Sequence, residues 1–128
     1  MLYTYTAVIT ESEGTFYAKI PDINGCITTA SSLSEAISLI TDALSLSLVV
    51  LEDEDIEPPH PTPQSEIVHG TNDILTVIQA DTIQYRSATD TKAVRKNVSL
   101  PAWLANLADK RGINCSKVLQ DALLSIFS

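Results

Sequence analysis

The first thirty residues alternate apolar and polar side chains with the period of two that half-buried β-strands show. Two such segments, residues 2–9 and 15–20, are separated by a short polar segment that ends in Gly14. This arrangement predicts a β-hairpin. An Asn-Gly pair then supplies a turn, and we expect a short third strand at residues 26–30.

A helical period follows. Ser32 and Glu35 have the spacing of a capping box, and apolar residues recur every three or four positions after them, which predicts a helix at residues 33–51. The chain must leave this helix before the proline-rich segment 58–63, because proline has no amide hydrogen and clashes with the preceding turn. We expect a loop up to residue 72.

Residues 74–80 are almost all aliphatic or β-branched, which is typical of a strand covered on both faces. The predicted order of the N-terminal domain, residues 1–81, is therefore β-β-β-α-β. One helix over a small mixed sheet covers only one sheet face, so the other face is a candidate interaction surface.

The last 37 residues, 92–128, predict a separate β-α-α module after a linker at residues 82–91. Strand residues of one parity are Val94, Lys96, Val98 and Leu100, and those of the other are Arg95, Asn97 and Ser99. Two helices follow Pro101, separated by Gly112 and a possible N-cap at Asn114. Their apolar stripes are Trp103, Leu104, Leu107 and Ala108, then Val118, Leu119, Ala122, Leu123, Ile126 and Phe127.

A lone strand and two short helices bury too little surface to be stable alone, and the strand's backbone groups need a partner. We therefore expect a homodimer in which two strands pair antiparallel; whether dimers join into tetramers stays open. The expected dimer core consists of Val98, Leu100, Trp103, Leu107, Val118, Leu119, Ala122 and Leu123. Lys96 has the parity of this core, so it must extend to the rim or the strand must fray there.

The opposite face of the paired strands forms a ribbon that fits the major groove of DNA. Arginine reads guanine and asparagine reads adenine, and exposed amides at the start of the second helix can hold a phosphate. The predicted DNA-binding residues are Lys92, Arg95, Asn97, Ser99, Asn114, Ser116 and Lys117. The alternative is that Arg95, Asn97 and Ser99 are only the solvated face of an edge strand.

Charge divides the chain at the same place. Residues 1–90 contain 14 Asp or Glu and 2 Lys or Arg, a net charge of −12, whereas residues 91–128 contain 2 and 6, a net charge of +4. The acidic part repels nucleic acid and attracts basic proteins, while the basic part suits a polyanion. Acidic residues that only keep the protein soluble are the competing interpretation.

Catalytic or metal-binding chemistry has little support in the sequence. Asp22, Glu35 and Asp42 form no required cluster, and we expect no metal, cofactor or catalytic residue. We expect His60 and His69 to be exposed. Cys26 and Cys115 are expected to be buried free thiols.

The most apolar region, residues 37–51, is interrupted by polar residues and is shorter than a bilayer span. With no positive segment near the N-terminus, we expect a cytoplasmic protein without a membrane partner.

Two resemblances sharpen this interpretation. Residues 95–101 (RKNVSLP), followed by residues 112–116 (GINCS), resemble the ribbon-helix-helix repressors of bacteria, although Lys96 and the helix start at residues 114–116 depart from their pattern. Residues 21–28 (PDINGCIT), residues 34–36 (SEA) and the acidic-to-proline passage are similar to HicB antitoxins over the whole chain, with Ala30 where glycine is more usual.

The second resemblance implies an α+β protein with a partial ribonuclease-H-like N-terminal domain that lacks catalytic carboxylates. It also implies a small basic partner, the mRNA-cleaving toxin HicA, and repression of the operon by the C-terminal domain. The acidic residues Glu52, Asp53, Glu54 and Asp55 are the first toxin-binding candidates. The alternatives are a ribbon-helix-helix repressor that senses a small molecule or metal, and an enzyme.

Overall fold

The computed structural model describes residues 1–128 and separates them into two compact units, Met1–Thr89 and Asp90–Ser128. We call them the N-terminal unit and the C-terminal unit and describe each by itself.

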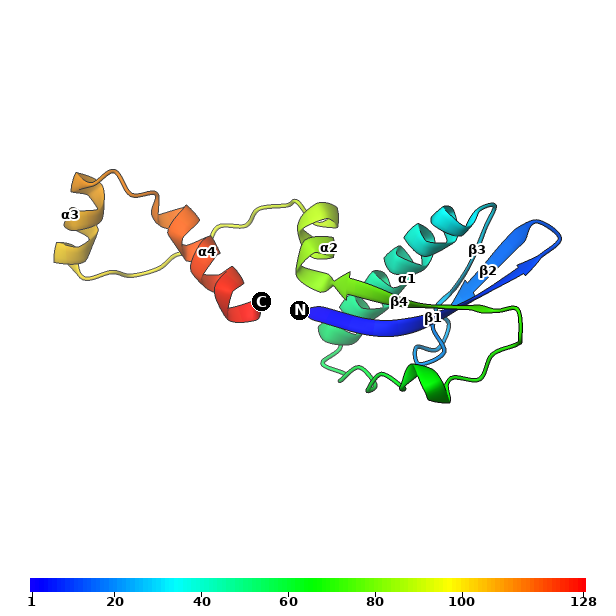
Figure 1. Ribbon diagram of the computed structural model, residues 1–128. Coiled ribbons are helices and arrows are strands. Elements are labelled where there is room, and N and C mark those ends of the chain that lie inside the picture. Colours follow the sequence, from blue (N-terminus) through cyan, green and yellow to red (C-terminus); the bar gives the residue numbers. More distant parts are fainter. The chain divides into compact units, whose positions relative to one another are not determined.

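The N-terminal unit is a four-stranded sheet with one long helix across one face (Figure 1). The strands are β1 (Leu2–Ser12), β2 (Thr15–Lys19), β3 (Ile27–Ala30) and β4 (Ile74–Asp81), and their order is β3-β2-β1-β4. The expected hairpin is confirmed: Glu13 and Gly14 connect β1 to β2 with φ of 51° and 81°, as a two-residue hairpin turn requires.

The sheet is entirely antiparallel, so the expectation of a mixed sheet was wrong. The reason is the long connection at residues 54–73, which contains the short helix η1 (Gln64–Glu66). Figure 1 shows this connection carrying the chain to the far end of the sheet before β4 returns beside β1.

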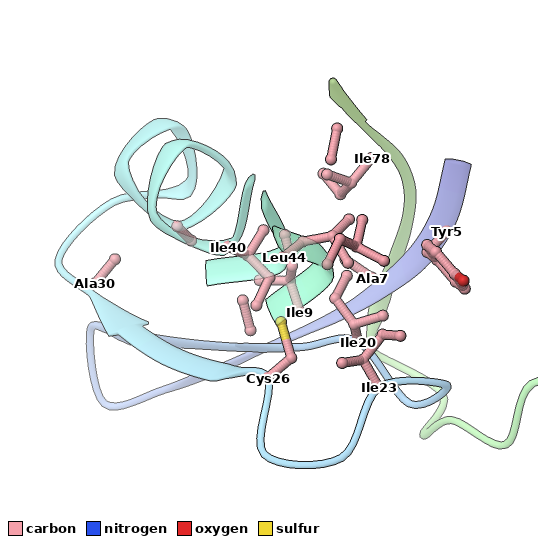
Figure 2. Close-up of a cluster of buried hydrophobic side chains, with 14 residues drawn as sticks. Tyr5, Ala7, Ile9, Ile20, Ile23, Cys26, Ala30, Ile40, Leu44 and Ile78 are labelled. Carbon is pink, nitrogen blue, oxygen red and sulfur yellow. The ribbon is translucent and has the colours of Figure 1, made fainter. Parts of the chain in front are cut away.

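Helix α1 (Leu33–Asp53) supplies the apolar stripe that closes the core. Its residues Ile40, Leu44 and Leu48 are fully buried against Ile9 of β1 and the side chains around it. Figure 2 draws Ile40 and Leu44 close to Ile9 and the sulfur atom of Cys26. Burying each large aliphatic side chain contributes about 1.5–3 kcal/mol, so this cluster is a major stabilising feature of the unit.

Both ends of α1 are capped. The Ser32 hydroxyl accepts a hydrogen bond from the Glu35 amide at 3.1 Å, while the Glu35 carboxylate accepts from Ser31. This is half of the expected capping box. At the other end Asp55 adopts φ of 56°, and the Ile56 amide donates to the Leu51 carbonyl, which is the Schellman arrangement usually built on glycine.

By length and composition alone, α1 could cross a membrane. In this fold its stripe of Ala36, Ile40, Leu44 and Leu48 is the inner wall of the sheet's core.

The last strand of the unit lies at a sheet edge and is not covered on both faces, contrary to the expectation for residues 74–80. Val77 is 54% exposed and Ile74 is 40% exposed. Helix α2 (Thr82–Thr89) follows at once, within the segment 82–91 that was expected to be a linker.

The C-terminal unit contains α3 (Ala102–Lys110) and α4 (Cys115–Phe127), as expected. Gly112 ends α3 with φ of 65°, and the Ile113 amide donates to the Ala108 carbonyl. The expected strand at residues 94–100 is not formed in the single chain: residues 90–101 have no regular secondary structure. A strand exists only when a neighbouring strand pairs with its backbone, and this unit contains none.

Candidate functional site

The C-terminal unit contains no buried side chain. Trp103 is 64% exposed and Val98 is 58% exposed, although the sequence pattern places both in a core. Of the eight expected dimer-core residues, Leu119 is half-buried and the other seven are exposed. An apolar surface of this kind marks an interaction site.

Part of that surface is a groove of about 450 Å³ between α3, α4 and the extended segment before them. Five expected dimer-core residues line it, namely Val98, Leu100, Val118, Leu119 and Ala122. Lys96 lines the same groove, so its side chain follows the parity that the sequence pattern assigned to it. The structure thus brings most of the expected core together around an open space.

The expected base-reading residues Arg95, Asn97 and Ser99 are exposed and lie in the extended segment, as does Lys92. The helix-start residues are partly engaged already. Asn114 caps α4 by accepting the Lys117 amide at 3.1 Å, and the Lys117 ammonium pairs with Asp121 at 3.3 Å.

Ser116, beside them, is exposed. An exposed pair four residues apart on a helix contributes only about 0.3–0.5 kcal/mol, so Lys117 can exchange Asp121 for a phosphate at small cost.

The acidic run at the end of α1 divides into two pairs. Glu52 accepts hydrogen bonds from the Tyr3 hydroxyl at 2.8 Å and the Thr82 hydroxyl at 2.9 Å, and Arg86 of α2 binds it at 3.1 Å. Arg86 also pairs with Asp53 at 2.9 Å. Glu52 and Asp53 therefore hold α2 on α1. Of the four acidic residues, only Glu54 and Asp55 are exposed and have no ion-pair or hydrogen-bond partner for their side chains.

This network changes the acidity of its members. Burial raises the pKa of the Tyr3 hydroxyl to about 12, with the neighbouring Glu52 carboxylate adding to the effect. Burial alone would raise the pKa of Glu52, but the hydrogen bonds from Tyr3, Thr82 and Arg86 outweigh it and lower that pKa. No sequence motif marks this cluster, because its members lie far apart along the chain.

The remaining candidates do not converge. Asp22 accepts hydrogen bonds from the amide and hydroxyl of Thr62, and no group of three or more His, Cys, Asp or Glu side chains could hold a metal ion. His60 and His69 are exposed, as expected.

Cys26 is buried, as expected, and burial raises the pKa of its thiol. Cys115 is exposed in the single chain, so the expectation that it is buried was wrong there; it borders the open groove.

Residues 5–121 match the model of a family described as HicB_like antitoxin of bacterial toxin-antitoxin system. The chain belongs to this family. Its role as the antitoxin of such a system follows, and a regulatory, non-enzymatic protein is what the family suggests. No curated protein matches the sequence.

Solved structures share the fold of this HicB-like antitoxin at low identity. A toxin-antitoxin complex from Streptococcus pneumoniae is 21% identical with a TM-score of 0.59, over 98% of this chain and 99% of that one. The antitoxin HicB of Burkholderia pseudomallei is 18% identical with a TM-score of 0.56 over the same shares. A HicA3 and HicB3 toxin-antitoxin complex is 19% identical with a TM-score of 0.50, over 62% of this chain and 99% of that one.

Proposed function

We propose that this chain neutralises a small basic HicA-like, mRNA-cleaving toxin through its N-terminal unit and represses its own operon through its C-terminal unit. In this proposal the N-terminal unit is a partial ribonuclease-H-like domain without catalytic function. The C-terminal unit is a ribbon-helix-helix module that binds operator DNA as a dimer or higher oligomer in the cytoplasm. The observation that carries it is that a basic unit without any buried side chain follows, along the chain, an acidic unit with a complete core.

Dimerisation supplies what the C-terminal unit lacks. A second copy can fill the groove with its own apolar residues and pair its extended segment with residues 94–100. Both of the unit's deficits, the open core and the unpaired backbone, are then met by one contact between identical surfaces. Lys96 and Cys115 also line the groove, and the proposal assigns them to the rim of that contact.

DNA binding is supported by the polar residues that remain exposed on the outer face of the paired strands. Arg95, Asn97 and Ser99 alternate with the groove residues and so project together from the ribbon. The segment 91–128 has a net charge of +4, which favours a polyanion. Toxin binding is supported by the acidic charge of the other unit, and by the solved complex in which HicB3 occurs with HicA3.

Operator binding tests the C-terminal half of the proposal. Arg95→Ala and Asn97→Ala are each expected to weaken specific binding by about 1–3 kcal/mol while the dimer persists. Lys117→Ala is expected to weaken binding to all sequences and to flatten its salt dependence, because a phosphate contact carries no base information. The measurement is fluorescence anisotropy with operator and scrambled duplexes over a range of salt. Full operator affinity in the Arg95 and Asn97 variants would show that neither residue recognises the bases of the operator.

A further inference from the structure

Helix α1 has a second apolar stripe that faces away from the core. Leu39, Leu46 and Val50 are spaced i, i+7 and i+11, so they share one face of the helix. They are exposed by 36%, 51% and 44%. The core of the unit uses the stripe of Ile40, Leu44 and Leu48 instead, so packing within the chain does not explain the outer stripe.

The outer stripe runs into a groove of about 510 Å³. Leu46 and Val50 form one wall, and the opposite wall is formed by Ile23, Asn24 and Pro59 with Asp22 beside them. Two hydrogen-bonded anchors hold the proline-rich segment in place: Thr62 donates to Asp22, and the Tyr5 hydroxyl donates to the Pro59 carbonyl. The groove is therefore formed before any partner arrives, which lowers the entropic cost of binding.

Carboxylates surround this stripe. Glu35 and Asp42 are exposed and lie one helical turn before Leu39 and Leu46, respectively. The exposed residues Glu54, Asp55 and Glu57 follow the end of the helix. No Lys or Arg occurs between Lys19 and Arg86, and Arg86 is already paired with Glu52 and Asp53.

The open face of the sheet is a weaker candidate than the sequence pattern suggested. Thr6 and Val8 point to that face and are buried, as is Ile67 of the long connection, so the middle of the face is covered. Its exposed apolar residues, Leu2, Tyr17, Ile27 and Val77, are scattered over four strands. The face also presents Lys19, which a basic partner would avoid.

We propose that the outer face of α1, defined by Leu39, Leu46 and Val50 with the groove beside them, is the docking surface for the basic toxin. An apolar side chain of the toxin occupies the groove, and its Lys or Arg residues pair with Glu35, Asp42 and the carboxylates after α1. This inference rests on the proposed toxin-binding function and adds the surface to it.

The test uses the 128-residue chain and, as the probe, the small basic HicA-like toxin that the proposed function names as its partner. Leu46→Arg and Val50→Arg each place a cation in the groove and against the incoming basic surface, and are expected to raise Kd by about 100-fold. Asp42→Lys, at an exposed position, is expected to slow association at low salt with little change in dissociation. Isothermal titration and stopped-flow fluorescence measure these quantities, and circular dichroism checks that each variant is folded.

Val77→Arg and Ile27→Arg are the matched controls, because they make the same kind of change at exposed apolar residues of the sheet's open face. Both are expected to bind the basic protein with a Kd within about threefold of that of the unaltered chain, as surface changes outside an interface do.

Loss of binding in these controls together with full binding by Leu46→Arg overturns the α1 surface while leaving the toxin-binding function intact. No binding by the unaltered chain overturns the function itself. A fall in the oligomeric state of Leu46→Arg assigns the face to a second copy and overturns the inference.

Discussion

Both units contain a helix with a regular apolar stripe, but the stripe is buried in the N-terminal unit and exposed in the C-terminal unit. In the N-terminal unit the helical stripe of α1 is buried within its own chain, and Ile40, Leu44 and Leu48 are inaccessible to solvent. In the C-terminal unit the equally regular stripe of α4 is open, with Val118 55% exposed and Leu123 40% exposed. A hydrophobic stripe therefore specifies that a helix face will be covered, but not whether the same chain covers it.

Charge follows the same division. The N-terminal unit has a complete core and a surface with almost no basic residues, so it can act as a ready surface for a basic partner. The C-terminal unit is basic and lacks a core, so in the proposed function its fold and its DNA-binding surface both depend on association. Concentration and salt should consequently affect the two units differently.

The largest expected effect is that of Leu123→Asp. It places an unpaired carboxylate in the proposed dimer core, a change that costs several kcal/mol and is expected to abolish self-association and DNA binding. The N-terminal unit should stay folded because its core is elsewhere. Sedimentation velocity and far-UV circular dichroism measure both parts of this result.

Leu124→Asp is the matched control for that change. Leu124 is also exposed, but it lies about 100° further around α4 than Leu123, outside the apolar stripe and the groove. We expect this variant to dimerise and to bind operator DNA. Equal loss of dimer in the two variants would contradict a core on the stripe of α4.

A smaller effect, within the N-terminal unit alone, is expected for Arg86→Ala. The side chain joins α2 to Glu52 and Asp53 of α1, and its loss leaves a half-buried carboxylate short of a partner. The expected destabilisation is about 1–3 kcal/mol, measured by urea unfolding. Dimerisation through the C-terminal unit should be unaffected; a weaker dimer would mean that the two units are not independent.

The pH dependence of the N-terminal unit follows from the same cluster. Because the pKa of folded Tyr3 is raised to about 12, its contribution to stability is complete below the ordinary tyrosine pKa near 10 and is lost as pH rises through 12. Because the pKa of folded Glu52 is lowered, its contribution is present above the ordinary pKa and is lost as pH falls through the lowered value. Thermal unfolding of Tyr3→Phe should show a smaller loss of stability at alkaline pH than the unaltered chain; the remainder is expected from Tyr5, whose pKa burial also raises.

The smallest expected effect is that of Asp55→Gly. Asp55 adopts φ of 56° at the end of α1, a conformation that glycine adopts without steric cost. Removing the carboxylate also removes an unfavourable charge at the negative end of the helix dipole. Since glycine is more flexible in the unfolded chain, the net gain is about 0.5 kcal/mol, detectable by differential scanning calorimetry. A loss of stability would show that the Asp55 side chain has a contact of its own.

Local patterns predicted most of the fold, and long-range contacts account for what they missed. The hairpin, α1, α3 and α4 follow from periodicity, turn residues and caps that lie close together in sequence. Helix α2 was missed because its position depends on Arg86 reaching Glu52, across 34 residues. For the same reason Glu52 was expected to be free for a partner although it is engaged within the unit.

The candidate sites show the same limit. Five of the eight expected dimer-core residues line one groove in the C-terminal unit, whereas Trp103, Leu107 and Leu123 do not. The five were predictable because the parity of a strand and the period of a helix are local properties. The expected strand at residues 94–100 is absent because the C-terminal unit contains no other strand to pair with it; the proposed function supplies that strand from a second copy. The apolar stripe that predicted α1 did not include Leu39, Leu46 and Val50, and nothing in the sequence marked these three as a second surface.

Hydrogen exchange of the full-length chain over a range of concentrations tests the central claim, that only the C-terminal unit depends on association, most directly. Sedimentation first fixes the range in which dimers dissociate. The account predicts that amide protection in α3 and α4 falls as the chain is diluted through this range, while protection in α1 and β1 is unchanged. Full protection of α3 and α4 in a monomeric chain would contradict it.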